Sequence, residues 1–413
     1  MIKEMSTIME TLRKKVDLEK CARLGAERIY GAKLPKEVED RLTDELQGIR
    51  VFGHEGEFIS TYLAVQIMDN AGEYHLARGA AGASLVNYFL GITSVNPLPP
   101  HYRCPHCKYA EFLPTSVEKG ENVPSPSGFD LISPYQEKVS CPKCGHFMVG
   151  DGHSLPAGFF YGTAGEKAPG FELDVRPAFG EWFRENAAEL LGEEVASRIR
   201  FREVGKDDEE GAESKETGKS YLIINLNPLL KDTRELERRT GILFRSIPID
   251  GISYNDFFEN EEYKDIPLLC DIPEENVAGT QMLCFSDVVK QLGEMYGTFQ
   301  MPPIPQDPDI FPVLHPFIFR EDIALFLMRY GIKEDEAVTI AENVGKGKTD
   351  RKPDLLDQAY LEAMGVPEAF CENIEGITYL FSRAHETEYA IFLFRLMWFR
   401  NHFPKTYLIV RTV

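Results

Sequence analysis

Apolar residues at helical intervals predict that the first part of the chain is mostly helix. Leu and Ile recur with this spacing through residues 1–48, and the turn-forming sequence at 31–35 predicts two helices joined by a short connection. The nearly unbroken apolar run at 57–68 predicts a third helix that is largely buried. Residues 73–76 predict a short strand, and the small residues at 77–84 predict a turn that opens another helix.

The pattern changes to strands in the middle of the chain and returns to helices at its end. An amphipathic helix is predicted near residues 182–199, and the apolar run Tyr221–Leu226 predicts a buried strand. The Pro-rich residues 302–316 predict a connector. Beyond the connector, helical spacing predicts four helices, at 320–330, 334–344, 354–363 and 374–403.

The composition is that of a folded protein with an acidic surface. With 413 residues, 45 of them basic and 66 acidic, the chain can form two to four domains and carries a formal net charge of −21. Because a dedicated nucleic-acid binder usually displays a net positive surface, any such surface here has to be local. The polar and charged residues 206–219 predict a long acidic surface loop. No apolar stretch is long enough to predict a membrane span, and the first residues lack the apolar core of a signal peptide.

Two CxxC sequences provide the strongest chemical signal in the chain. Cys104-Pro-His-Cys107 and Cys141-Pro-Lys-Cys144 are separated by 33 residues. Two such turns supply the four sulfurs of a tetrahedral zinc site, and a site filled by four cysteines leaves no position for a catalytic water. We therefore predict a structural Zn²⁺ ion and a reducing, cytoplasmic location. The alternatives are chance pairs or redox dithiols.

The small-residue turn offers a candidate phosphate site. Arg78, Gly79 and Ser84 bring a guanidinium, free backbone N–H groups and a hydroxyl to the start of a predicted helix. This combination suits a phosphate group. The alternative is that the small residues serve close packing.

Other candidate residues give weaker signals. Glu172 and Asp174 alternate along a predicted strand, so they share one face and could hold a divalent metal ion, although solvated strand edges show the same pattern. Lys346 and Lys348, in a Gly-Lys-Gly-Lys sequence after a predicted helix, could contact a nucleic-acid backbone or simply be solvated. His385 lies on an apolar predicted helix, where a histidine is ordinarily satisfied by its neighbours.

Taken in order, these segments resemble the PolC-type bacterial DNA polymerase III alpha subunits, a C-family group of replicative polymerases. The resemblance is strongest around residues 85–107 and 317–412 and covers most of the chain. It is carried by the segments Arg78–Ser84, 92–107, Asp151–His153 and 285–289, and by the C-terminal residues from Phe319 onward, including Arg320, the Gly-Lys-Gly-Lys sequence, His385 and 402–404.

The resemblance implies an α+β fold with a nucleotidyltransferase-like palm, a zinc-knuckle insert and a helical fingers domain. It also implies that Arg78, Gly79 and Ser84 bind nucleotide phosphate. Lys346, Lys348 and His385 are implied to contact DNA. The implied domains are an N-terminal helical part with the start of the palm (1–101), the zinc insert (102–150), the rest of the palm with a reduced thumb (151–303) and a fingers-like domain (304–413).

The chain departs from the family at the catalytic positions. The first catalytic Asp of the family aligns with Gly170, the second with Glu172 and the third with Asn225, while Asp174 stands where the family has Asn. Two-metal phosphoryl transfer depends on carboxylates at such positions. We therefore expect a truncated and catalytically degenerate relative, without the exonuclease, phosphoesterase, tandem DNA-binding and clamp-binding regions of the family.

Three functions follow as hypotheses. In the first, the chain is a non-catalytic module that binds primed DNA or replication proteins. In the second, it is a zinc-stabilised regulator that binds proteins and has no affinity for DNA, as the acidic charge favours. In the third, it is an active minimal DNA polymerase that uses Glu172 and Asp174, and only this hypothesis requires Mg²⁺.

Overall fold

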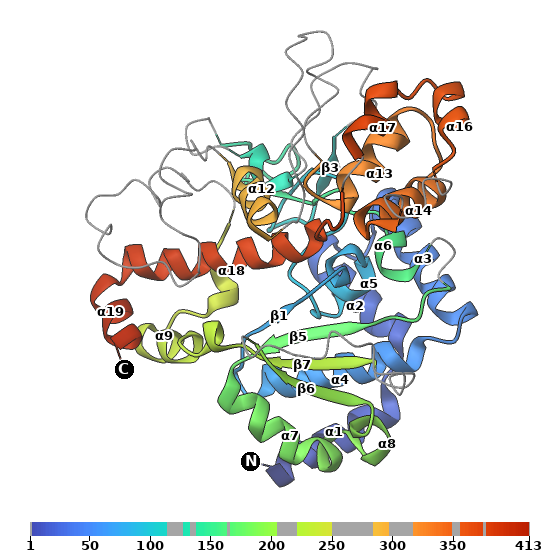
Figure 1. Ribbon diagram of the computed structural model, residues 1–413. Coiled ribbons are helices and arrows are strands. Elements are labelled where there is room, and N and C mark those ends of the chain that lie inside the picture. The colour runs from blue at the N-terminus through green and yellow to red at the C-terminus, as the bar shows by residue number, and fades with distance from the viewer. Residues whose placement is uncertain are drawn as a thin grey trace.

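The computed structural model describes residues 2–113, 127–132, 138–162, 166–204, 221–249, 284–296, 317–348, 356–374 and 377–412. Helices and two small sheets form a mixed α+β fold, as the sequence predicts (Figure 1). The acidic segment 206–219 and the Pro-rich connector 302–316 lie outside the described residues.

Four helices form the N-terminal part: α1 (Ile2–Lys15), α2 (Leu18–Tyr30), α3 (Lys36–Val51) and α4 (Glu55–Asn70). The prediction of two helices within residues 1–48 was wrong, because a helix ends and another begins near Asp17. The Asp17 carboxylate accepts a hydrogen bond of 2.8 Å from the backbone N–H of Lys20 and so caps the new helix. The predicted turn at 31–35 and the predicted buried helix α4 are confirmed.

A four-stranded sheet with the order β1-β5-β7-β6 lies beside these helices. Its strands are β1 (His75–Ala77), β5 (Phe171–Val175), β6 (Ile199–Glu203) and β7 (Leu222–Leu226). Strand β1 is antiparallel to β5, whereas β5, β7 and β6 are parallel to one another. Because side chains alternate along a strand, Phe171, Leu173 and Val175 enter the hydrophobic core, and the residues between them face the other way. Helix α7 (Pro177–Leu191) packs against β6 and β7.

A second, antiparallel sheet with the order β3-β2-β4 carries the Cys-rich insert. Its strands are β2 (His101–Arg103), β3 (Ala110–Phe112) and β4 (Val149–Asp151). Arg103 and Asp151 pair across β2 and β4, with the guanidinium Nε 2.6 Å from the carboxylate. This contact holds the pKa of Asp151 at about 2, although burial of the carboxyl group opposes the shift.

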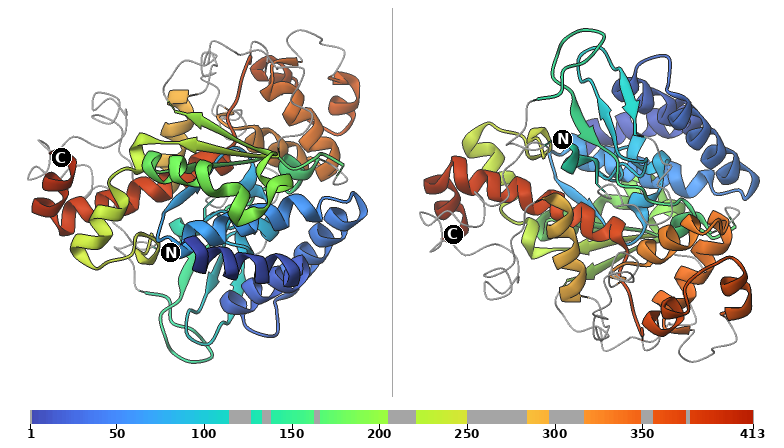
Figure 2. Two further views of the ribbon diagram at one scale, coloured as in Figure 1. Left: turned by 90° about the horizontal axis from the view of Figure 1, so that it is seen from below. Right: turned by 90° about the horizontal axis from the view of Figure 1, so that it is seen from above.

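The C-terminal part is helical, as predicted. Its helices are α12 (Phe285–Tyr296), α13 (Arg320–Arg329), α14 (Glu334–Gly345), α16 (Gln358–Ala363), α17 (Glu368–Ile374), α18 (Arg383–His402) and α19 (Pro404–Thr412). The long predicted helix at 374–403 begins only at Arg383, because the segment before it forms a β-bridge between Phe381 and Phe319. In Figure 2 the Cys-rich insert and helices α13–α17 project from opposite sides of the molecule.

Helix α18 packs the C-terminal helices and the N-terminal part of the chain into one core. It crosses the molecule above the four-stranded sheet and packs against β1, α12 and the short 3₁₀ helix η1 (Ala81–Ala83) (Figure 1). A Cβ atom on Gly82 would lie 3.2 Å from the Cβ of Ala384, so the two backbones approach closely. The Thr93 hydroxyl donates a 2.7 Å hydrogen bond to Glu388, a residue 295 positions further along the chain. Among the described residues, no helix combines the length and apolarity that crossing a bilayer requires.

Candidate functional site

The polar face of the four-stranded sheet gathers the predicted catalytic residues. Glu172 and Asp174 lie on the same face of β5, and the parallel register places Asn225 of β7 directly beside Asp174. Arg200 and Arg202 of β6 lie on this face too, because Arg202 is paired with Asn225. Arg200 is half-buried and Arg202 is exposed, and the described residues offer neither an ion pair nor a hydrogen bond to them.

Three donors occupy the buried carboxylate of Asp174. Arg78 donates from Nη1 at 3.1 Å and Asn227 from Nδ2 at 2.7 Å, both to Oδ2, while Asn225 donates from Nδ2 to Oδ1 at 3.0 Å. The Arg78 guanidinium also lies 3.9 Å from the half-buried Glu172 carboxylate. A fixed cation therefore stands between the two carboxylates that the sequence offered as ligands for a divalent metal ion. Asn225 contributes a donor to the carboxylate and no charge of its own.

Helix α18 places two further titratable groups beside Arg78. Burial, together with the nearby charge of Arg78, lowers the pKa of His385 to about 3. Burial raises the pKa of Glu386 to about 8, and Arg78 only partly opposes this shift. Neither Glu386 oxygen nor His385 Nδ1 has a hydrogen-bond partner within the described ranges. At neutral pH both groups are therefore mainly uncharged, and Arg78 provides the positive charge at this point.

We expect Glu386→Gln to flatten the dependence of stability on pH. The folded pKa of Glu386 is about 8, against an ordinary value of 4.5, so the folded chain binds the additional proton between these values. The stability from this group is complete below pH 4.5 and is lost as the pH rises through about 8, at a slope of about 1.4 kcal/mol per pH unit. Urea unfolding from pH 5 to 9 should show the variant gaining stability relative to the wild type as pH rises. Glu189→Gln, at an exposed position of α7, is the control; a constant difference between Glu386→Gln and the wild type would contradict the expectation.

The candidate phosphate residues do not converge in this structure. Gly79 is exposed and has a φ of 61°, which favours glycine, and it follows Arg78 at the edge of the polar face. Ser84 is buried on the inner side of the turn, where its hydroxyl caps helix α5 (Leu85–Phe89) by accepting from the Asn87 N–H at 3.1 Å. The same hydroxyl donates to Glu45 at 3.0 Å.

Glu45 organises this inner side of the turn. Its buried carboxylate accepts the Arg41 guanidinium at 2.6 Å and the Tyr161 hydroxyl at 2.9 Å, in addition to Ser84. It also accepts the backbone N–H groups of Leu85 and Val86, at 3.1 and 3.2 Å. Glu45 thereby satisfies the free donors at the start of α5 and fixes the position of the turn.

The two lysines of the Gly-Lys-Gly-Lys sequence lie at the end of α14. Lys346 is exposed and forms an ion pair with Glu342, which also holds Arg320 at 2.7 Å. Lys348 is exposed and donates to Asn343 at 3.4 Å. The glycine between the lysines has a φ of 61°, and a Cβ atom there would lie 2.7 Å from a backbone oxygen. Backbone conformation and close packing therefore account for a glycine at this position.

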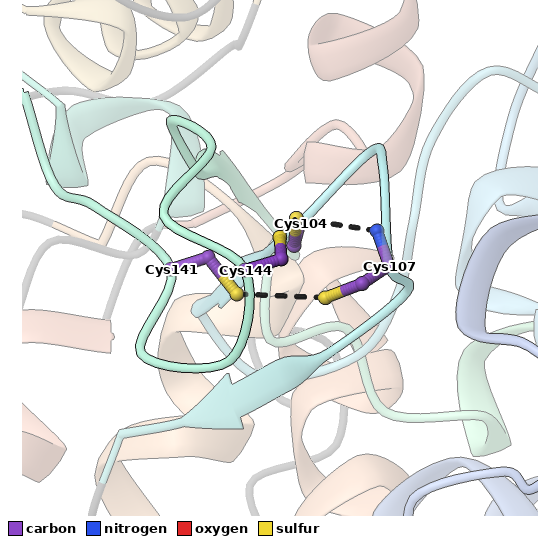
Figure 3. Close-up of side chains that lie close together, drawn as sticks. All are labelled: Cys104, Cys107, Cys141 and Cys144. Atoms are coloured by element: carbon purple, nitrogen blue, oxygen red, sulfur yellow. Dashed lines mark hydrogen bonds between the residues drawn. The ribbon is translucent and has the colours of Figure 1, made fainter.

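The four cysteines of the insert converge, as their spacing predicts (Figure 3). The Sγ atoms of Cys104 and Cys144 are 3.5 Å apart, as are those of Cys107 and Cys141, and all four lie within 4.8 Å of one another. The sulfurs of a tetrahedral zinc site with bonds of about 2.3 Å are separated by about 3.8 Å. This four-cysteine cluster could therefore hold a metal ion such as zinc.

The two knuckles that carry the cysteines are built alike. In each, the residue after the second cysteine turns left-handed, Lys108 with a φ of 65° and Gly145 with a φ of 74°. Its N–H donates back to the carbonyl of the first cysteine, at 3.0 Å to Cys104 and 2.9 Å to Cys141. This backbone turn fixes the sulfur positions through local hydrogen bonds.

Four residues that shape the site were not predicted from the sequence, three on the polar face and one beneath the turn. Asn227 follows β7 two residues after Asn225, so alternation along the strand could have placed it on the same face. Arg200 and Arg202 alternate with Phe201 in the same way on β6. Glu45 gave no such signal, because it lies among other charged residues of an amphipathic helix.

Comparison with known proteins finds a matching family profile and relatives that are longer than this chain. Residues 16–205 match the family profile described as "Bacterial DNA polymerase III alpha NTPase domain". Over 92% of its length, the chain is 27% identical to the protein named DNA polymerase III PolC-type of Lactococcus lactis, and it covers 28% of that protein. The proteins of the same name from Caldanaerobacter subterraneus and Thermotoga maritima are 27% and 26% identical over 95% and 92% of the chain, which covers 33% of each. The chain thus spans about a third of the length of these relatives.

Proposed function

Because this chain is a relative of the PolC-type bacterial DNA polymerase III alpha subunits, we propose that it is a non-catalytic module of DNA replication that binds primed DNA. In this proposal the four-stranded sheet is a polymerase-like palm, the Cys-rich insert holds a structural zinc ion and helices α13–α19 correspond to the fingers. The expected domain limits are 1–101, 102–150, 151–303 and 304–413.

The pairing of Asp174 is the observation that carries the proposal. Two-metal phosphoryl transfer needs carboxylates that are free to coordinate divalent ions. On the polar face, Arg78, Asn225 and Asn227 already occupy both oxygens of Asp174. Gly170, at the position of a family Asp, brings no carboxylate. A magnesium ion would have to displace the Arg78 guanidinium, and Glu172 would remain as its other ligand.

The two arginines of β6 on the polar face support DNA binding. Within the described residues Arg200 and Arg202 have no acidic partner, so phosphate groups could bind them, whereas Arg78 is neutralised by Asp174. Lys346 and Lys348 offer a second exposed pair after α14. A local basic surface of this kind can bind DNA despite a net charge of −21, because contacts with phosphate depend on nearby charge and are weakened by salt.

Fluorescence anisotropy with a labelled primer–template across a salt series tests the proposal. We expect binding at low salt that weakens steeply as salt rises. Replacing Arg200 and Arg202 together with Ala should reduce the slope of log K against log salt by about 2, one unit for each phosphate contact. The matched control replaces two exposed lysines of the N-terminal helices, Lys20 and Lys36, and should leave the slope unchanged.

The same preparations should not extend the primer with Mg²⁺ or Mn²⁺. Extension that disappears when Glu172 and Asp174 are both replaced by Ala would overturn the non-catalytic proposal and support an active minimal polymerase. Absence of binding at low salt would overturn the DNA-binding proposal.

A second candidate function is a regulator that binds replication proteins and not DNA. Internal neutralisation of the cations favours it: Arg78 is paired with Asp174, and Arg320 and Lys346 are both paired with Glu342. With a net charge of −21, the surface then suits a basic protein partner. A folded, metal-loaded chain that fails to bind primer–template at any salt concentration would support this function.

A further inference from the structure

Two histidines stand at the outer rim of the four-cysteine cluster. His106 precedes Cys107 in the first knuckle, and His146 lies two residues after Cys144 in the second. Their exposed rings are stacked with centroids 3.8 Å apart and an interplanar angle of 4°. One nitrogen of each ring and the Sγ atom of Cys144 lie within 4.8 Å of one another.

The fold of the insert brings these rings together. His146 is tied to the second knuckle because its carbonyl accepts the Cys141 N–H at 2.8 Å. His106 lies inside the first knuckle, between two of the cluster cysteines. When the four sulfurs converge, the two imidazoles therefore meet at one edge of the cluster, beside Cys144.

We propose that this rim is a second metal site, in which the exposed rings of His106 and His146 turn out of their stacked arrangement so that both bind one ion, which the Cys144 thiolate shares with the four-cysteine cluster. Imidazole nitrogen and thiolate sulfur are the ligands of Zn²⁺, Co²⁺ and copper, whereas Mg²⁺ and Ca²⁺ prefer oxygen. The ligand set therefore selects a borderline or soft ion.

Electrostatics favours a second ion at this position. Four thiolates around one divalent ion carry a net charge of −2, so a further cation at their edge is attracted. A thiolate bound to one metal ion retains lone pairs and can bridge to another. With three protein ligands, the second ion keeps an open position for water or for a ligand from outside, which the four-cysteine cluster does not have.

Counting the metal ions on the full-length chain tests the proposal. Native mass spectrometry in the presence of excess Zn²⁺ should find two ions on the wild type and one on the variant carrying His106→Asn and His146→Asn. The ion that remains reports that the four-cysteine cluster, and with it the insert, is still folded. His402→Asn, at an exposed position on α18, is the matched control and should keep both ions.

Titration with Co²⁺ gives a second readout. The wild type should show absorbance increases through two equivalents, and the double variant through one. A single ion on the wild type, or two on the double variant, would overturn the proposal. A double variant that holds no ion would have lost the four-cysteine cluster as well. The variants His106→Asn and His146→Asn are then measured separately, and each is expected to keep the ion of the cluster and to lose the second. None of these measurements involves DNA, so their outcome is independent of the DNA-binding proposal.

Discussion

Replacing Cys141 with Ser should release the metal ion from the four-cysteine cluster and unfold the sheet formed by β2, β3 and β4. In the described part of the segment, the apolar cluster around the sulfurs has only Cys104, Cys141 and Met148 as buried members, which is too few to hold this region without the metal ion. Structural zinc sites contribute roughly 10–16 kcal/mol of apparent binding free energy, which becomes folding free energy of the segment that binds. Hydrogen exchange should therefore show loss of protection in residues 101–113 and 138–151, and metal analysis should show the loss of the ion.

Cys21→Ala provides the control for this experiment. It removes a thiol from α2, outside the cluster, and should leave both the metal content and the protection of the insert unchanged. Full protection of the insert in the Cys141→Ser variant, or in metal-free wild type, would show that the metal ion does not stabilise the fold.

Glu45→Ala should destabilise the whole chain by about 3–5 kcal/mol, the usual cost of removing one partner of a buried ion pair. The substitution leaves Arg41 without its carboxylate and removes the acceptor shared by Ser84 and Tyr161. It also uncaps two backbone N–H groups at the start of α5. Urea unfolding followed by circular dichroism measures the change as a lower midpoint.

Two companion variants separate the causes of this loss. Glu45→Gln keeps an acceptor without the charge and should fall between the wild type and Glu45→Ala. Glu37→Ala, at an exposed position of the same helix, should change stability by less than about 0.5 kcal/mol. A loss of under about 1 kcal/mol for Glu45→Ala would mean that the network around Ser84 does not hold the turn in place.

Local patterns in the sequence predict much of this structure. The Cys spacing predicts the convergence of four sulfurs because two short turns leave the side chains few alternatives. Alternation along Phe171–Val175 and the apolar run of β7 predict two strands, and the structure pairs them. The break at Asp17 was missed because the apolar spacing continues across it, although Asp is a favoured N-cap residue.

The contacts that decide the chemistry are long-range and leave no local pattern. Arg78 and Asp174 are 96 positions apart, and only the pairing of β1 with β5 brings them together. A sequence shows that a carboxylate is present, but not that an arginine and two amides occupy it. For the same reason, the raised pKa of Glu386 could not be expected from a helix that looks uniformly apolar on one side.

The long separation in sequence between Thr93 and Glu388 affects how the protein folds as it leaves the ribosome. At translation rates of about 5–20 residues per second, the 295 positions between the two residues take about 15–60 s to emerge. During this interval β1 and η1 lack the helix that covers them, and their apolar side chains stay open to solvent or to other nascent chains. Helix α18 thus covers β1 only late in synthesis. A polypeptide released before residue 383 is made would leave β1 uncovered and would be prone to aggregation.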